Sequence, residues 1–202
     1  IGGLAGDAIT TGAYNTAVGT SALGANTTAS YNTAVGGLAL TVNTTGAENV
    51  AVGMNTLDSN TTGANNTGLG TGALQSNTTA SNNTGLGHNA LFANITGTVN
   101  VAVGTSALAA NTTASYNTAL GYAALTTNIT GAQNTAVGYS ALTLATGADN
   151  TAVGSQALAS VAAGTFNTAL GRSAGQGLTT GIENTLIGAL AGDSLTDADY
   201  NV

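Results

Sequence analysis

The side chains able to carry out acid–base or nucleophilic chemistry are few and scattered in this sequence. His88 is the only histidine, Arg172 is the only basic residue, and there is no cysteine. A general base needs a partner within hydrogen-bonding reach, and no such partner recurs near His88 or Arg172. We therefore expect both to be surface residues, and we predict no catalytic residue, no cofactor and no enzymatic activity.

The densest acidic group is formed by Asp193, Asp197 and Asp199 near the end of the chain. Hard cations such as Ca²⁺ prefer several oxygen ligands. The group lacks both the spacing of an EF-hand loop and a glycine-rich calcium repeat. We read it as a solvated loop and predict no metal site.

Composition excludes several partners. The formal net charge is −7 with one arginine and no lysine, whereas nucleic acids and anionic membranes are bound through cations. No apolar run reaches the roughly 18 residues of a spanning helix, so we expect no membrane insertion. Low charge with 43% hydrophobic residues also argues against disorder.

These residues belong to a repeat that organises the whole chain. The motif Asn-Thr-Ala-Val/Leu-Gly returns every 17 residues, with a single step of 16 between Asn134 and Asn150. The leading asparagines are Asn15, Asn32, Asn49, Asn66, Asn83, Asn100, Asn117, Asn134, Asn150, Asn167, Asn184 and Asn201. The motif glycines are Gly19, Gly36, Gly53, Gly70, Gly87, Gly104, Gly121, Gly138, Gly154, Gly171 and Gly188.

We number each unit from its asparagine, which is position 1. The unit then reads Asn, Thr, Ala, Val/Leu, Gly, two variable residues, Ala, Leu, two variable residues, Asn, Thr, Thr, Gly/Ala and two variable residues. The residue missing from the short unit falls between Leu142 and Thr146, where we expect a turn because turns absorb deletions and strands do not.

The unit favours strands over helices. Glycine at position 5 and paired threonines are poor helix formers, and Thr-Ala-Val suits an extended chain. We expect a short strand over positions 1–4, a glycine turn, a second strand near positions 8–10 and an Asn/Thr/Gly corner. The predicted fold class is all-β, a parallel β-solenoid (β-roll) of about twelve 17-residue coils. We expect residues 1–202 to form a single repeat domain that is a fragment or repeating unit of a longer fibre.

Charges indicate which positions face water. Asp7, Asp58 and Asp193 fall at position 10. Glu48, Asp149 and Glu183 fall at position 17, and His88 and Arg172 at position 6. Positions 1–5, 8 and 9 carry no charge, so we expect them to be enclosed. Leucine at position 9 is replaced by Gly175 where Leu178 appears at position 12, which indicates that both positions fill one core slot.

An uncharged strand requires cover on both faces. Positions 2 and 4 point one way and position 3 the other. We expect the small-residue face at position 3 (Ala17, Ala34, Ala51 and their equivalents) to pack against further copies. The predicted partner is therefore the chain itself, in a homotrimer or, second, in a head-to-tail filament.

The asparagines allow two interpretations. Those at position 1 predict a ladder of side-chain hydrogen bonds along the rod. Those at position 12 each begin an Asn-x-Thr sequon and are either corner-forming residues or sites of glycosylation: Asn26, Asn43, Asn60, Asn77, Asn94, Asn111 and Asn128. Nearby Thr and Ser residues are candidates for O-linked sugars.

Aromatic residues recur at position 17. Tyr14, Tyr31, Tyr116, Phe166 and Tyr200 either pack at the corner, which we favour, or form a stripe that stacks sugars. The threonines at positions 13 and 14 suggest an ice-binding surface. Adjacent residues of a strand point in opposite directions, however, which argues against one flat threonine array.

The motif in Asn100–Gly104 with Ala107, and in Asn117–Gly121 with Ala124, resembles the head repeats of trimeric autotransporter adhesins (YadA type). Similar arrays occur in phage tail fibres and bacterial surface proteins. The resemblance implies a trimeric β-roll displayed on a cell surface or virion, with a host-surface or glycan receptor. We therefore expect an extracellular, non-catalytic rod. The alternatives are a self-polymerising filament subunit and an ice-binding β-solenoid.

Overall fold

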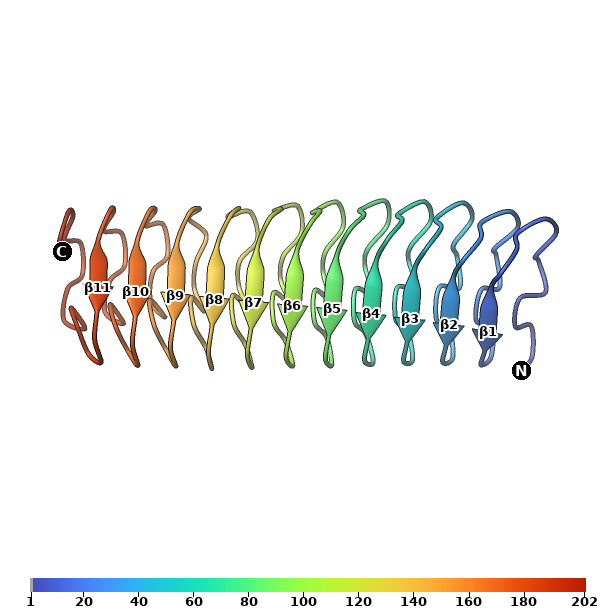
Figure 1. Ribbon diagram of the computed structural model, residues 1–202, viewed down its shortest axis with the longest axis horizontal. Coiled ribbons are helices and arrows are strands. Elements are labelled where there is room, and N and C mark those ends of the chain that lie inside the picture. The colour runs from blue at the N-terminus through green and yellow to red at the C-terminus, as the bar shows by residue number, and fades with distance from the viewer. Residues whose placement is uncertain (1) are drawn as a thin grey trace.

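The chain folds into a rod of stacked coils in the computed structural model, which describes residues 2–202 (Figure 1). Each coil contributes one three-residue strand, and the eleven strands form one parallel sheet in sequence order. The strands are β1 (Thr16–Val18), β2 (Thr33–Val35), β3 (Val50–Val52), β4 (Thr67–Leu69), β5 (Thr84–Leu86), β6 (Val101–Val103), β7 (Thr118–Leu120), β8 (Thr135–Val137), β9 (Thr151–Val153), β10 (Thr168–Leu170) and β11 (Thr185–Ile187). The predicted all-β parallel solenoid is confirmed. The eleven strands mark ten steps of the repeat. Residues 2–14, which precede β1, wind one further coil that carries no strand.

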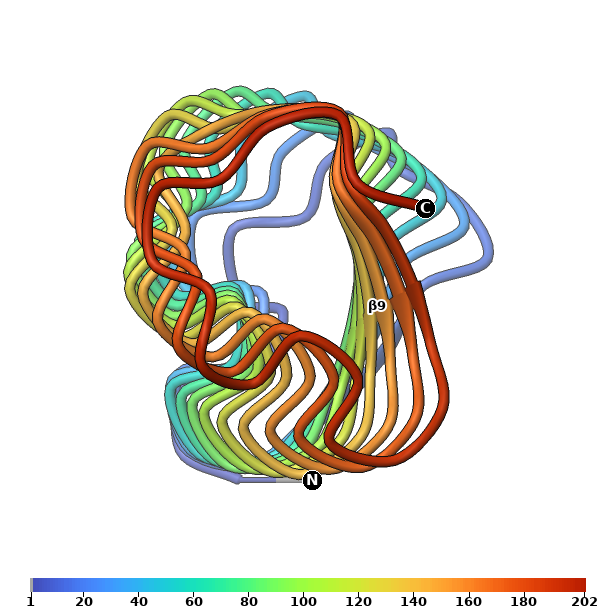
Figure 2. The same ribbon diagram turned by 90° about the vertical axis from the view of Figure 1, so that its left-hand side faces the viewer.

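The register of the sheet follows the repeat. Ala17 pairs with Ala34 across the 17-residue step, and Ala136 pairs with Ala152 across the short step of 16. The missing residue is absorbed between β8 and β9 outside any strand, as predicted. Viewed along the rod, successive coils are rotated relative to one another, so the whole sheet twists (Figure 2).

The predicted second strand at positions 8–10 is wrong, because this wall of the coil is a series of tight turns. Positions 7 and 9 adopt a left-handed backbone, as at Ser106 (φ 58°) and Leu108 (φ 51°). Successive backbone N–H groups alternate between a carbonyl acceptor in the same coil and one in the next coil. Ala107 donates to the Gly104 carbonyl of its own coil at 3.2 Å, and Leu108 donates to the Ala124 carbonyl of the next coil at 3.0 Å. The wall is thus hydrogen-bonded between coils without being extended.

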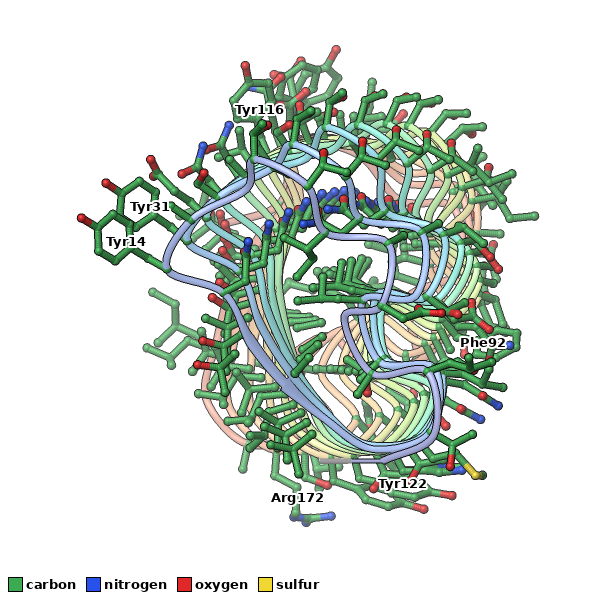
Figure 3. All side chains as sticks on the ribbon, turned by 90° about the vertical axis from the view of Figure 1, so that its right-hand side faces the viewer. Tyr14, Tyr31, Phe92, Tyr116, Tyr122 and Arg172 are labelled. Carbon is green, nitrogen blue, oxygen red and sulfur yellow. The ribbon has the colours of Figure 1, made fainter. Side chains whose placement is uncertain are left out.

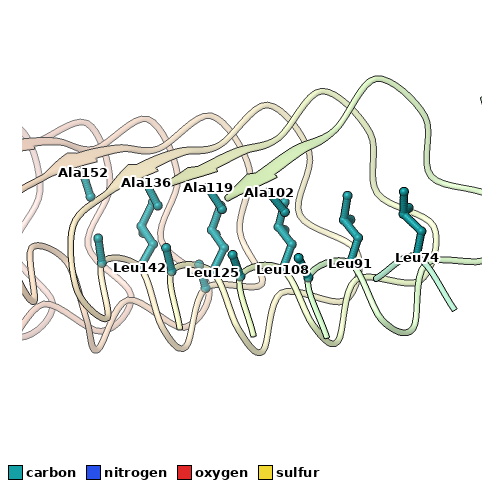
Figure 4. Close-up of a cluster of buried hydrophobic side chains, with 14 of the residues drawn as sticks. Leu74, Leu91, Ala102, Leu108, Ala119, Leu125, Ala136, Leu142 and Ala152 are labelled. Carbon is teal, nitrogen blue, oxygen red and sulfur yellow. The ribbon is translucent and has the colours of Figure 1, made fainter. Parts of the chain in front are cut away.

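Position 3 of the strand faces the interior. Ala102, Ala119 and Ala136 are fully buried, and they point toward leucines at position 9 such as Leu108 and Leu125 (Figure 4). The small-residue face is therefore the inner wall of the core and is not available to a partner. The prediction that copies pack through the face of Ala17, Ala34 and Ala51 is therefore wrong.

Positions 2 and 4 face outward, which corrects their assignment as enclosed. Val18, Leu120 and Leu170 at position 4 are 41%, 46% and 49% exposed. Because the coil is a single chain wound around one thin core, a strand has only one face to bury, and side chains alternate between faces. Positions 1, 3, 8 and 9 are enclosed as predicted, and position 12 joins them.

The last coils confirm that positions 9 and 12 share a core slot. Leu178 is fully buried, and it lies in the same apolar cluster as Leu158. A Cβ on Gly175 would lie 2.8 Å from Cδ1 of Leu186, the one leucine at position 3. Large and small residues therefore exchange places so that the core volume stays filled.

A second exchange links Thr56 at position 8 with Gly68 at position 3 of the next coil. Thr56 donates to the Gly70 carbonyl at 2.7 Å, and a Cβ on Gly68 would lie 2.5 Å from its Cγ2 methyl. Most other coils have alanine at both positions. The missing Cβ of Gly68 therefore leaves the space that the Thr56 methyl group occupies.

This contact predicts a strong energetic coupling between substitutions of Thr56 and Gly68. Gly68→Ala alone is expected to lower the free energy of unfolding by about 1–3 kcal/mol because it overpacks the core. In a Thr56→Ala background, the same substitution should be neutral or stabilising, since the pair then matches the other coils. Urea denaturation of the double-mutant cycle measures the coupling. Additive effects of the two substitutions would contradict the contact.

Candidate functional site

The residues with catalytic chemistry stand apart from one another. His88 and Arg172 lie in exposed turns at position 6, and Arg172 projects from the edge of the rod (Figure 3). Neither side chain forms a hydrogen bond or ion pair to another part of residues 2–202. The described chain contains no pocket. The structure therefore brings together no catalytic constellation from these residues.

The acidic residues also remain separate. Asp193 accepts from Ser194 at 3.2 Å and Asp199 accepts from the Ile182 N–H at 2.8 Å. Across residues 2–202, no three acidic or histidine side chains come close enough to hold a metal ion. Burial raises the pKa of Asp58 above its ordinary value, while hydrogen bonds from Ser59 act in the opposite direction.

The asparagines at position 1 form a continuous ladder inside the rod. The Oδ1 of Asn100 accepts the backbone N–H of Asn117 at 2.9 Å. Its Nδ2 donates to the Ala114 carbonyl at 2.8 Å. Because the same bonds recur from coil to coil, each asparagine joins its own coil to the next one. Asn100 is fully buried, so the ladder is structural and offers no surface for a ligand.

The asparagines at position 12 form a second ladder. Asn111 donates to the Oδ1 of Asn94 at 2.8 Å and to the Ala114 carbonyl at 3.0 Å. Both ladders therefore meet at the same carbonyl of position 15. All seven sequon asparagines are fully buried: Asn26, Asn43, Asn60, Asn77, Asn94, Asn111 and Asn128.

This geometry rules out a glycan on these asparagines in the folded rod. An N-linked sugar replaces a hydrogen on Nδ2, and that atom is used here for hydrogen bonds in the interior. Their role as corner-forming residues in the interior therefore fits the structure. The Asn-x-Thr pattern therefore does not indicate glycosylation of the folded rod.

The glycines at position 5 form a column of close backbone contact. Their φ angles lie between 126° and 140°, a region that is essentially restricted to glycine. A Cβ on Gly36 would lie 2.4 Å from the carbonyl oxygen of Gly53 in the next coil. These residues hold the turn that follows each strand.

The aromatic residues at position 17 are not packed at the corner, so the prediction of corner packing is wrong. Tyr14, Tyr116 and Phe166 are 78%, 61% and 58% exposed, and Tyr14 and Tyr31 project from the rod (Figure 3). Their rings stack on each other, with centroids 5.0 Å apart. Tyr122 and Tyr139 at position 6 stack in the same way at 5.5 Å.

The outer face of the sheet, which we call the outer ribbon, is not covered by any other part of the described chain. It consists of positions 2 and 4 of β1–β11, where Thr or Val alternates with Val, Leu or Ile. No charged residue lies in it. At about 4.8 Å per strand it runs for roughly 50 Å. An uncharged strip of this length, with an aliphatic side chain in every strand, is unusual on the surface of an isolated soluble protein.

Threonines at positions 13 and 14 form a second regular surface. Thr44 and Thr45 are both exposed, so the expectation that such neighbours point in opposite directions is wrong. This part of the coil is a bend and not a strand. The hydroxyl of Thr44 donates to the Thr61 carbonyl at 3.0 Å.

The fold and these surfaces define the class of protein: a single-chain parallel β-solenoid built from 17-residue coils. Comparison with protein-family models, with curated proteins and with solved structures finds no match. No helix in residues 2–202 has the length and apolar character to span a bilayer.

Proposed function

We propose that this chain is a non-catalytic structural rod of an extracellular or virion fibre, built by packing copies of itself side by side through the outer ribbon. The observation that carries the proposal is this uncharged ribbon of threonine and aliphatic side chains, which are exposed or half-buried along the whole sheet. A homotrimer is the favoured assembly, and the resemblance to surface-adhesin heads and tail fibres supports display outside the cell.

Burial favours this assignment. Full burial of an exposed valine or leucine side chain is worth roughly 1.5–3 kcal/mol, and position 4 supplies a partly exposed Val, Leu or Ile side chain in every strand. A partner made of the same coils has the same axial spacing, so its side chains fit the ribbon coil by coil. The twist of the sheet (Figure 2) suits rods that wind around each other more than it suits a flat surface.

The mass of the native particle in solution tests the proposal. Light scattering or sedimentation of the 19.2 kDa chain should give a discrete oligomer, with three copies as the expected number. A clean monomer would contradict side-by-side packing. An open-ended polymer would favour the alternative, a self-polymerising filament subunit.

A matched pair of variants places the interface. Leu120→Glu puts a charge on the outer ribbon, where Leu120 is 46% exposed. Leu144→Glu puts the same charge on a turn, where Leu144 is 48% exposed. We expect Leu120→Glu to weaken association at least about tenfold, since a charge buried at an interface needs a partner. Leu144→Glu should leave the mass unchanged. Equal effects of the two would move the interface elsewhere.

Ice binding is a second candidate, favoured by the exposed threonines at position 14 and, in some coils such as that of Thr44, at position 13. Ordered hydroxyls and methyl groups at one coil spacing would contact a regular lattice. The sheet twist opposes a match to a planar surface. Thermal hysteresis in solution tests this candidate directly, and an effect abolished by Thr45→Lys but not by Leu144→Lys would support it.

A further inference from the structure

The outer ribbon is bordered by two rims of opposite character. Position 17 lies two residues before each strand and position 6 two residues after it, so the two columns run along opposite edges of the ribbon. Tyr14 and Tyr31 mark the first rim, and Tyr122 and Arg172 the second (Figure 3). We call them the acidic rim and the basic rim, for the following reason.

All charges of the two rims are segregated by sign. The acidic rim carries Glu48, Asp149 and Glu183 and no base. The basic rim carries Arg172 and the sole histidine, His88, and no acid. Arg172 is exposed and forms no ion pair within residues 2–202. Its acidic counterparts lie across the ribbon, roughly 15–20 Å away for six extended residues. One copy of the chain therefore cannot pair them.

Symmetry decides which rims meet between copies. When parallel rods are related by rotation about an axis along the rod, the acidic rim of one copy lies against the basic rim of the next at equal height. When rods are antiparallel and their ribbons face each other, each rim lies against the same rim of its partner. The acidic rim would then meet another acidic rim, which is unfavourable.

The charged residues of the two rims also lie at matching positions along the rod axis. Phe166 and Arg172 stand at the two ends of β10, while Asp149 and Glu183 stand one coil to either side at β9 and β11. One coil is about 4.8 Å, which is within the reach of an arginine side chain. Phe166 is 58% exposed, and an aromatic face binds a guanidinium group.

We propose that copies of this chain pack parallel and in register, with Arg172 of one copy over Phe166 and between Asp149 and Glu183 of the next. This inference rests on the proposed self-association and adds direction and register to it. The pairing makes Arg172 a registration residue. A shift by about three to five coils, or a reversal of one rod, leaves it without an acidic partner within one coil.

Engineered cysteines test direction and register. The chain has no cysteine, and Tyr116 and Tyr122 flank β7 on opposite rims. In the full chain, Tyr116→Cys with Tyr122→Cys should form a covalent oligomer under mild oxidation with oxidised glutathione. Neither single variant should crosslink. The two sites of one chain are too far apart to bond to each other.

The outcomes separate the two levels of the proposal. Covalent oligomers from the double variant alone support parallel, in-register packing. Crosslinking of a single variant, or a native oligomer whose double variant does not crosslink, overturns this packing and leaves self-association standing. A monomer in sedimentation overturns both.

Charge exchange tests the role of Arg172. Arg172→Glu should weaken association about tenfold at low ionic strength, and adding Glu183→Arg to the same chain should restore most of the loss. Thr105→Glu, on the basic rim of a coil whose neighbours at position 17 are Asn82 and Tyr116, is the control and should have a smaller effect. Failure of the second charge to rescue the first would overturn the pairing.

Discussion

Replacing Gly36 with alanine is expected to lower the free energy of unfolding by about 3–5 kcal/mol. Its φ of 139° excludes other residues from this backbone conformation, and the new Cβ would lie 2.4 Å from the Gly53 carbonyl oxygen and 2.6 Å from its carbon. Both atoms belong to the backbone of the next coil, so relieving the contact means separating two coils. Urea denaturation followed by circular dichroism measures the effect.

The neighbouring glycine provides the control. A Cβ on Gly37 meets nothing within 4 Å, and Gly37 has no positive φ. Gly37→Ala should therefore be neutral or stabilise slightly, because alanine restricts the unfolded chain more than glycine does. Similar losses for the two variants would mean that close packing at position 5 does not limit stability.

Asn100→Asp is expected to destabilise the rod by about 3–5 kcal/mol at pH 7. The substitution keeps the shape of the side chain but replaces a donor with an acceptor. The new oxygen would face the Ala114 carbonyl, to which Nδ2 of Asn100 now donates at 2.8 Å. A charge would also be buried at a site with no exposed surface. Chemical denaturation against the unsubstituted chain gives the difference.

The loss should depend on pH with a defined sign. Burial raises the pKa of a carboxyl group above its unfolded value of about 3.9. The protonated form is tolerated best, so the variant should be most stable below that value and lose stability as the pH rises through the folded pKa. Asn82→Asp, at an exposed position, should show changes within about 0.5 kcal/mol. A pH-independent loss for Asn100→Asp would exclude a buried charge as the cause.

The periodicity of the sequence predicts the coil, the register and the placement of the one-residue deletion. It also predicts that Leu178 replaces the leucine missing at Gly175. These predictions succeed because they depend only on the equivalence of units: residues that recur in step must stack. The ladder of position 1 follows for the same reason, since identical amides one coil apart are within hydrogen-bonding distance.

The direction of each side chain was harder to predict. Position 3 holds alanine and position 2 holds threonine or valine, and none of these is large or charged enough to mark a face. The wall that carries Leu108 decides the question, and Leu108 stands in a left-handed conformation that sequence rules assign to glycine or asparagine. No residue in that wall signals its tight turns, so the sequence predicts a strand there and assigns the inner and outer faces of the first strand the wrong way round.

The hydrogen bonds between coils run along the axis of the rod, which determines how it responds to load. A pull on the two ends stretches successive coil interfaces in series, so the weakest interface sets the breaking force however many coils are stacked. Bundled rods would share a load at each height, and a weak interface in one would be bridged by its neighbours.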